Sequence, residues 1–388
     1  MKSRFRAMGA NRSGRTQDAR RLAEGLDTVS ISPNGQHGRM TDWSAPDPLF
    51  VPEGRVVDLP GRGETFVRTH RGPPGSPTVL LLHGWTATAD LNWFATYQGL
   101  AQRASLIAVD HRGHGRGLRT SRPFVLEAVA DDAAAVLESL EAGPAIAVGY
   151  SMGGPIALHL AKRHPQLVSG LVLAGTSLSF NTTLLSALQR VSLPLFGIAL
   201  RWDINRWLFR RLIDDVGGQD ELVAAWRDRL LGEAKRGTPS DLLEAGRALR
   251  HYDARPFAAD LGLPASVVVT VGDRMVQPRR QRHMAEELAA PIVELQGDHD
   301  VFLRNGAAFA AAVCSAVENV AALQRATASG ALRLTPRTAA DRRSVLRRRR
   351  ERRRLGKPSA GPRPGSRRQR LAARLPWRRR RLGAESAG

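Results

Sequence analysis

Short apolar runs alternate with longer stretches of helical periodicity along most of this chain. Eight runs with the length and pattern of strands occupy residues 55–59, 64–69, 78–83, 106–110, 145–150, 171–174, 266–271 and 292–295. Helical spacing of apolar residues is found at 90–103, where Asp90 is the expected N-cap, and at 126–141, 155–161, 279–288 and 301–323. The first two runs flank the turn 60–63 and predict an antiparallel pair at the sheet edge. Strands that alternate with helices predict an α/β fold, with a doubly wound, mostly parallel sheet of eight strands covered on both faces.

The regular alternation stops between residues 177 and 262. This segment carries only helical patterns, at 184–191, 202–212, 221–231 and 242–249. We interpret it as a helical cap inserted into the core. The core then consists of a first part, 51–176, and a second part, 263–324.

Charge is concentrated in the terminal segments. The net charge is +22, but residues 325–388 hold 22 Lys and Arg against three Asp and Glu, whereas residues 51–324 hold 28 of each sign. Residues 1–50 and 325–388 also lack the apolar pattern of a core, so we predict that both are disordered. Any contact with nucleic acid or anionic lipid is expected from the arginine-rich tail, 325–388. Only four of the 58 basic residues are lysine, so a GC-rich coding sequence is an alternative explanation for this tail.

The single cysteine, Cys314, excludes an internal disulfide and is typical of a reducing compartment. It lies in an alanine-rich helical pattern and is expected to be a small buried residue. The first 50 residues lack the apolar core of a secretory signal, and no apolar run reaches about 18 residues. We therefore expect a cytoplasmic protein without a transmembrane segment. No spacing of His, Cys, Asp and Glu resembles a metal site, and neither a metal nor a cofactor is predicted.

The most informative stretch joins the run 145–150 to the helical pattern that begins near Pro155. Its centre is Gly149-Tyr150-Ser151-Met152-Gly153, a G-x-S-x-G pattern at a strand-to-helix junction. A turn this tight strains the serine backbone and lifts its hydroxyl out of the sheet. Ser151 is therefore the candidate nucleophile, and the alternative is a glycine-rich packing turn.

A serine hydroxyl needs a base to take its proton, usually a histidine oriented by a carboxylate. Such partners are expected just after strands, because the crevice of a parallel sheet lies at the carboxyl ends of its strands. The histidines in such positions are His83, His111, His114 and His299. The acids are Asp110, Asp273, Asp298 and Asp300.

These motifs give the chain a resemblance to the α/β-hydrolase family, specifically to serine esterases and lipases with a helical cap. The resemblance covers residues 55 to about 323. It rests on His83-Gly84-Trp85, Asp110-His111-Arg112-Gly113-His114-Gly115, the G-x-S-x-G pattern, Gly272-Asp273-Arg274 and Gly297-Asp298-His299-Asp300. The chain order of nucleophile, acid and histidine also agrees with this family. The resemblance implies that Ser151 is the nucleophile, Asp273 the orienting acid and His299 the general base and acid.

The chain departs from the family pattern near the acid. Thr270 stands where the family often has glycine, and Pro278 lies one position later than the usual proline. Asp298 is therefore an alternative acid, although its place next to His299 makes contact with that ring difficult.

By the same resemblance, the backbone N–H groups of Trp85 and Met152 form the oxyanion hole. His83, His111 and His114 are expected to stabilise loops near the site rather than to act on substrate.

The resemblance implies hydrolysis of carboxylic esters of apolar substrates through an acyl-enzyme intermediate, with a small-molecule ester as the partner. A serine nucleophile disfavours the haloalkane dehalogenase and epoxide hydrolase branches, which use aspartate. The cap aromatics Trp202, Trp207 and Phe209 are candidates for substrate contact, although most apolar cap residues are expected to hold the cap onto the core. The alternatives are another serine acyl hydrolase or acyltransferase, such as a C–C hydrolase, a thioesterase or a cofactor-free peroxidase relative, and a polyanion-binding protein that acts through the tail.

Overall fold

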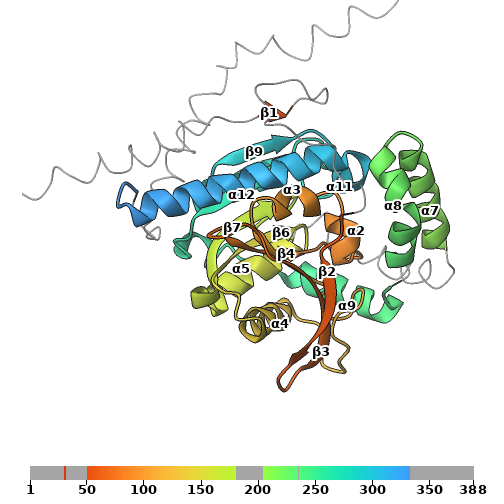
Figure 1. The fold of residues 1–388 in the computed structure, drawn as a ribbon, viewed down its shortest axis with the longest axis horizontal. Helices are drawn as coiled ribbons and strands as arrows, with labels where there is room; N and C mark the ends of the chain where they lie inside the picture. Colours follow the sequence, from red (N-terminus) through yellow and green to blue (C-terminus); the bar gives the residue numbers. More distant parts are fainter. Residues whose placement is uncertain (1–29, 32–49, 181–203, 235, 333–388) are drawn as a thin grey trace, which may run out of the picture. The chain divides into compact units, whose positions relative to one another are not determined.

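The computed structural model describes residues 30–31, 50–180, 204–234 and 236–332 (Figure 1). Within these ranges nine strands form one sheet, in the order β1-β9-β8-β7-β6-β4-β5-β3-β2. Their bounds are β1 (Ser30–Ile31), β2 (Glu53–Leu59), β3 (Gly63–His70), β4 (Thr78–Leu82), β5 (Ser105–Val109), β6 (Ala145–Tyr150), β7 (Val168–Ala174), β8 (Ala265–Thr270) and β9 (Ile292–Leu295). The β2–β3 and β3–β5 pairs are antiparallel, and all other neighbours in the sheet are parallel.

Helices cover both faces of this sheet (Figure 1). The core helices are α2 (Ala89–Trp93), α3 (Tyr97–Ala101), α4 (Leu126–Ser139), α5 (Gly153–Arg163), α10 (Pro278–Leu288), α11 (Val301–Arg304) and α12 (Gly306–Ala328). Leu80 and Leu82 of β4 pack in one apolar cluster with α4, α5 and α10, whereas Val79 and Leu81 pack in a second cluster with α2, α3 and α12. Successive strand side chains point to opposite faces, so two covering layers require the unbroken apolar run seen in β4.

Three helices lie between β7 and β8 in the described part of the predicted cap. They are α7 (Ile204–Gly217), α8 (Glu221–Glu233) and α9 (Pro239–His251). Asp220 caps α8 by accepting from the N–H groups of Leu222 and Val223, and Thr238 caps α9. Trp226 of α8 is fully buried in the same cluster as α2, so this helix is packed onto the core. The predicted helix at 184–191 lies outside the described residues.

The ends of the core differ from the prediction in two places. The eight predicted strands are present, and the two-residue strand β1, which the sequence did not predict, adds a ninth by pairing with β9. At the other end, α12 continues to Ala328 and Leu332 is only 7% exposed, so the core extends past the predicted boundary at 324.

Two predicted helices are each divided into two shorter helices. The pattern at 90–103 forms α2 and α3, and the N-cap of α2 is Thr88, whose hydroxyl accepts from Leu91 N–H; Asp90 is instead a buried residue inside the helix. The pattern at 301–323 forms α11 and α12, because Asn305 interrupts the helix and caps α12 through Ala308 N–H.

Among the described helices, α12 is long and apolar enough to cross a membrane by length and composition, with a mean hydropathy of 1.6. The sequence of α12 does not form an unbroken apolar run of about 18 residues, because polar residues are interspersed along it. Half of the most apolar 18-residue stretch of α12 is buried, and the helix packs against β7, β8 and β9. A soluble core helix has the same properties, and we interpret α12 as part of the core.

Candidate active site

Ser151 lies at the turn between β6 and α5, and its backbone has a φ angle of +51°. This left-handed conformation is strained for a residue with a side chain. The turn also requires glycine on both sides, because a Cβ at Gly149 would lie 2.3 Å from the Gly153 carbonyl oxygen and one at Gly153 would lie 1.9 Å from the Leu82 carbonyl oxygen. The strand, turn and helix around Ser151 are therefore the ones that the G-x-S-x-G pattern predicts.

Three side chains meet at the carboxyl ends of β6, β8 and β9. His299 Nε2 lies 2.9 Å from Ser151 Oγ, and His299 Nδ1 lies 2.8 Å from Asp273 Oδ2. The Asp273 carboxyl is fully buried, while 15% of the His299 side chain is exposed. In this geometry an imidazole can take a proton from the serine hydroxyl, and the carboxylate can stabilise the imidazolium that forms.

Asp273 is fixed by four hydrogen bonds besides its contact with His299. Its Oδ1 accepts from the N–H groups of Met275 and Val276, at 2.9 and 2.7 Å. Its Oδ2 accepts from the hydroxyl of Thr270 at 2.7 Å and from Nε2 of Gln281 at 3.2 Å. Sequence reasoning missed Gln281, and it noted Thr270 only as a departure from the family pattern. Thr270 could have indicated this contact, because a hydroxyl three residues before an aspartate is able to reach its carboxylate.

Asp298, the alternative acid, does not contact the His299 ring. Its Oδ1 accepts from the backbone N–H groups of Arg274 and His299, at 2.9 and 2.7 Å. The hydrogen bond from Arg274 N–H lowers the pKa of Asp298, against a smaller opposing effect of burial. Asp298 therefore holds the loop that carries His299, and the imidazole is paired with Asp273.

The two predicted oxyanion donors belong to segments that border Ser151. Trp85 follows Gly84, and a Cβ at Gly84 would lie 3.4 Å from Ser151 Cβ. Asn92 Oδ1 holds this loop by accepting from Gly84 N–H at 2.8 Å. Met152 begins the turn into α5, where the first N–H groups have no acceptor within the helix.

The predicted substrate contacts in the cap are only partly described. Trp202 lies outside the described residues. Trp207 is 58% exposed, with the guanidinium of Arg211 over its ring, whereas Phe209 is half-buried against the apolar cluster of α2 and α12. The indole N–H of Trp85 donates to the Leu242 carbonyl at 2.7 Å, so α9 contacts the loop next to Ser151.

Three further histidines, His83, His111 and His114, lie buried in the loops after β4 and β5. His111 N–H donates to His83 Nε2 at 3.0 Å, so His83 Nδ1 is protonated and donates to the Gly84 carbonyl at 2.8 Å. Burial lowers the pKa of His83 to about 4 and that of His114 to about 3, and it also holds the pKa of His111 well below its usual value. These neutral imidazoles pack against one another and against the backbone, which fits the expected role in stabilising loops.

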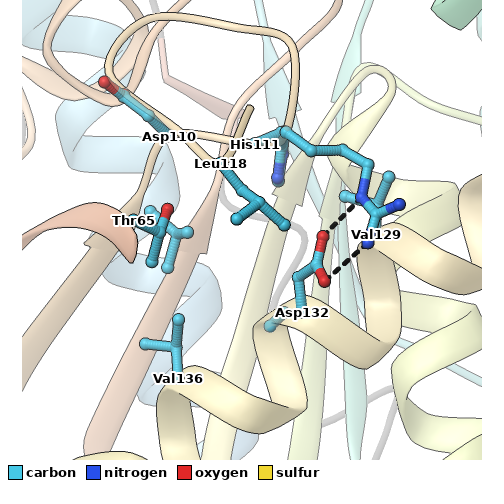
Figure 2. A pocket seen from close by; sticks show the side chains of 10 residues that line it. Thr65, Asp110, His111, Leu118, Val129, Asp132 and Val136 are labelled. Atoms are coloured by element: carbon cyan, nitrogen blue, oxygen red, sulfur yellow. Dashed lines mark hydrogen bonds and ion pairs between the residues drawn. The ribbon is translucent and has the colours of Figure 1, made fainter. Parts of the chain in front are cut away.

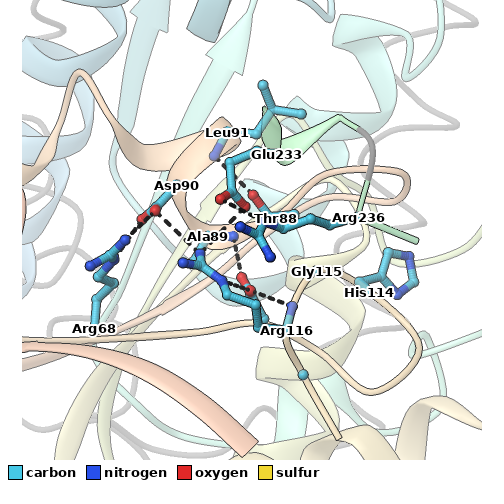
Figure 3. A network of polar contacts seen from close by, with 12 residues as sticks. Arg68, Thr88, Ala89, Asp90, Leu91, His114, Gly115, Arg116, Glu233 and Arg236 are labelled. Carbon is cyan, nitrogen blue, oxygen red and sulfur yellow. Dashed lines mark hydrogen bonds and ion pairs between the residues drawn. The ribbon is translucent and has the colours of Figure 1, made fainter. Parts of the chain in front are cut away.

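A cluster of buried charges lies beside these histidines (Figure 3). Asp110 Oδ1 accepts from Ala89 N–H at 2.7 Å and thereby fixes the end of the loop that carries Trp85. The guanidinium of Arg116 reaches Asp90 and Asp110 at 3.2 Å and Glu233 of α8 at 3.3 Å.

Asp90 is the most buried acid of this cluster. It accepts from the guanidinium of Arg68 at 2.9 and 2.6 Å and from the hydroxyl of Tyr97 at 3.0 Å. Burial alone would raise the pKa of Asp90, but the hydrogen bonds and charge of Arg68 outweigh it and hold the pKa below its usual value. Burial raises the pKa of Glu233, with Arg116 opposing it. The cluster therefore joins β3, α2, the loop after β5 and helix α8.

A small cavity lies between the loop after β5 and α4, where Arg112 forms an ion pair with Asp132 (Figure 2). Its volume is about 10 Å³, room for about one water molecule. Neither Ser151 nor His299 lines it. Within the described ranges no group of three or more His, Cys, Asp and Glu is arranged to hold a metal ion.

Comparison with known proteins adds family evidence to this geometry. A family model described as the alpha/beta hydrolase fold matches residues 77–306. A pimeloyl-[acyl-carrier protein] methyl ester esterase of Chromobacterium violaceum is 32% identical over 255 residues, which cover 63% of this chain and 96% of that enzyme. An enzyme of the same name from Stenotrophomonas maltophilia is 30% identical over 266 residues, which cover 66% of this chain and 94% of that enzyme.

Solved structures share the fold at lower identity. A hydrolase from Pseudomonas aeruginosa superposes with a TM-score of 0.57 at 22% identity, over 68% of this chain and 98% of that one. An enol-lactonase from Burkholderia xenovorans superposes with a TM-score of 0.56 at 20% identity, over 68% of this chain and all of that one. At this identity the structures support the fold alone.

Proposed function

Because the chain belongs to the alpha/beta hydrolase fold family, we propose that it is a carboxylic-ester hydrolase that works through an acyl-enzyme intermediate on Ser151. Its esterase relatives support ester hydrolysis as the class of reaction. The observation that carries the serine mechanism is the hydrogen-bond chain from Ser151 Oγ through the His299 ring to Asp273.

In the proposed acylation step, His299 Nε2 takes the hydroxyl proton of Ser151 while Oγ attacks the ester carbonyl. The buried carboxylate of Asp273 stabilises the imidazolium during this step. When the tetrahedral intermediate collapses, the bond to the alcohol breaks and His299 returns the proton to the leaving alcohol. A water molecule then attacks the acyl-serine by the same route and releases the carboxylic acid.

The negative charge on the tetrahedral intermediate requires preorganised donors. We assign this role to the backbone N–H groups of Met152 and Trp85. Gly84, held by Asn92, brings the Trp85 loop against Ser151, and the turn into α5 places Met152 directly after the nucleophile.

For the substrate we propose small esters with an apolar acyl chain. The helices α7, α8 and α9 act as a cap over the site, and α9 contacts its edge through Trp85. Trp207, with more than half of its side chain exposed, is the described cap aromatic available to a substrate, while Phe209 contributes mainly to packing. Since relatives at about 30% identity are named methyl ester esterases, methyl esters are the first leaving group to test.

The experiment compares wild type and Ser151→Ala on p-nitrophenyl esters of increasing chain length and on the corresponding methyl esters. We expect wild type to hydrolyse them and Ser151→Ala to lose activity by roughly 10⁵-fold or more. Ser177→Ala is the matched control, because Ser177 is also buried and its hydroxyl donates only to the Ser179 carbonyl at 2.8 Å. Equal rates for wild type and Ser151→Ala would end the proposal. Turnover of thioesters or C–C substrates in preference to esters would favour the other serine acyl hydrolases.

We propose a cytoplasmic location on the strength of the single cysteine.

Any binding of nucleic acid or anionic lipid is assigned to the tail, so a chain that ends at Pro336 should keep its esterase activity and lose that binding.

A further inference from the structure

Side chains hold the backbone of His299 on both sides of its Cα. Its N–H donates to Asp298 Oδ1 at 2.7 Å. Its carbonyl accepts a hydrogen bond from the hydroxyl of Tyr150, which directly precedes Ser151 in the chain. The residue next to the proposed nucleophile is therefore tied to the backbone of the proposed base.

The Tyr150 ring has little freedom to move. It is 2% exposed, and its centroid lies 5.4 Å from that of the His299 ring. It also makes edge-on contacts with Phe302 and Phe309, with centroids 5.6 and 5.3 Å apart. Gly175 leaves the space for it, because a Cβ there would lie 2.9 Å from Tyr150 Cε2. The direction of the phenol hydroxyl is thus set by packing on several sides.

We propose that Tyr150 is a positioning residue, whose hydroxyl anchors the His299 carbonyl and so fixes the imidazole at hydrogen-bond distance from Ser151 Oγ. This inference rests on the proposed function, because it takes His299 to be the base. His299 lies in the loop after β9, beyond the hydrogen bonds that pair the strands. The position of its backbone therefore depends on hydrogen bonds from side chains. Tyr150 belongs to the sheet, and through it the same rigid strand places both the nucleophile and the base.

The donor role is stable over the working pH range. Burial raises the pKa of Tyr150 well above 10, and the nearby carboxylates of Asp273, Asp300 and Asp298 raise it further. The phenol therefore stays protonated and remains a donor.

The test is Tyr150→Phe, which removes the hydroxyl and keeps the aromatic contacts. We expect kcat to fall roughly tenfold with KM nearly unchanged, since a small displacement of a reacting group slows the chemical step. Fluorophosphonate labelling of Ser151 should slow by a similar factor. Tyr252→Phe is the matched control: Tyr252 is equally buried, and its hydroxyl has no hydrogen-bond partner among the described residues, so its loss should leave kcat unchanged.

Two further readouts separate positioning from a general loss of structure. In proton NMR, the low-field signal of the proton between His299 Nδ1 and Asp273 should broaden or shift in Tyr150→Phe and stay in place in Tyr252→Phe. Asp298→Ala releases the backbone N–H of the same residue, His299, and the Asp298 side chain is 37% exposed, so this variant should fold and show the same loss of kcat without a change in KM.

Unchanged kcat, labelling rate and low-field signal in Tyr150→Phe would overturn the inference. Equal losses in Tyr150→Phe and Tyr252→Phe would also overturn it, because they would reflect packing alone. Failure of the proposed function has a different signature, in which wild type itself neither hydrolyses esters nor takes the label on Ser151.

Discussion

The carboxyl edge of the sheet has two sides that use the same residue types differently. On the reacting side, formed by the loops after β6, β8 and β9, the His299 imidazole is partly exposed and lies between a serine and a carboxylate. On the supporting side, formed by the loops after β4 and β5, the imidazoles of His83 and His114 are buried and contact backbone atoms. A position after a strand is common to both, so it is exposure and the contacting partner that distinguish a candidate base from a structural histidine.

The acids of the two sides show the same contrast. Asp273 and Asp110 both follow a strand, and both accept hydrogen bonds from backbone N–H groups. Asp110 forms an ion pair with Arg116, whereas the partner of Asp273 is the His299 imidazole, which in the proposed mechanism gains its charge during the reaction. In that mechanism, the charge of Asp273 stabilises the imidazolium.

The largest expected effect comes from Asp273→Asn. The amide cannot stabilise the imidazolium and favours the wrong tautomer of His299, so kcat should fall by roughly 10⁴-fold. Stability should change much less. Steady-state kinetics and thermal unfolding measure the two effects separately. For Asp110→Asn we expect the opposite pattern, with a clear loss of stability and a much smaller loss of kcat. A loss of kcat as large as that of Asp273→Asn would remove the distinction between the two sides.

The next effect is on stability and concerns the supporting side. Asp90→Ala leaves the partly buried guanidiniums of Arg68 and Arg116 without their shared, fully buried partner, which should lower the free energy of unfolding by about 3–5 kcal/mol. Asp228→Ala is the control, because Asp228 forms an ion pair with Arg227 but its side chain is 95% exposed. The control should change stability by less than about 0.5 kcal/mol. Urea unfolding tests both, and similar values for the two variants would contradict the account.

Acid pH should destabilise the supporting side. Burial lowers the folded-state pKa values of His83 to about 4 and of His114 to about 3, below the value of 6.5 for an unperturbed histidine. The unfolded chain therefore binds protons below pH 6.5 that the folded chain does not, so this stability is complete above pH 6.5 and is lost as the pH falls toward 4. NMR titration of the ring nitrogens should find both imidazoles neutral at pH 5, and titration near 6.5 would refute the prediction.

The smallest effect is expected from Asp298→Asn. The amide oxygen still accepts from the N–H groups of His299 and Arg274, so kcat should fall less than about threefold. This variant also tests the choice of acid. A loss comparable to that of Asp273→Asn would make Asp298 the orienting carboxylate.

Much of the reacting side was predictable from local sequence. The strands have unbroken apolar runs because both faces of the sheet are covered, and Ser151 lies in a turn whose glycines are sterically required. The resemblance to the family then singled out His299 and Asp273 among several candidates, and the structure brings these two residues to Ser151.

The supporting side was not predictable in the same way. Arg68, Asp90, Arg116 and Glu233 belong to four separate segments, and no local pattern indicates that their charges meet. For the same reason Asp90 was wrongly predicted to be an N-cap. Aspartate is common at N-caps, but the side chain of Asp90 pairs with the distant Arg68. The strand β1 was missed because two residues carry no periodicity, and their pairing depends on the distant strand β9.

The most direct test of the central claim is covalent labelling of the full chain with a fluorophosphonate probe, followed by mass spectrometry of the labelled peptide. The account predicts one label, on the peptide that contains Ser151, with labelling lost in Ser151→Ala and strongly slowed in His299→Ala. Labelling at another residue, or equal labelling of wild type and His299→Ala, would contradict the claim that Ser151 is a nucleophile activated by His299.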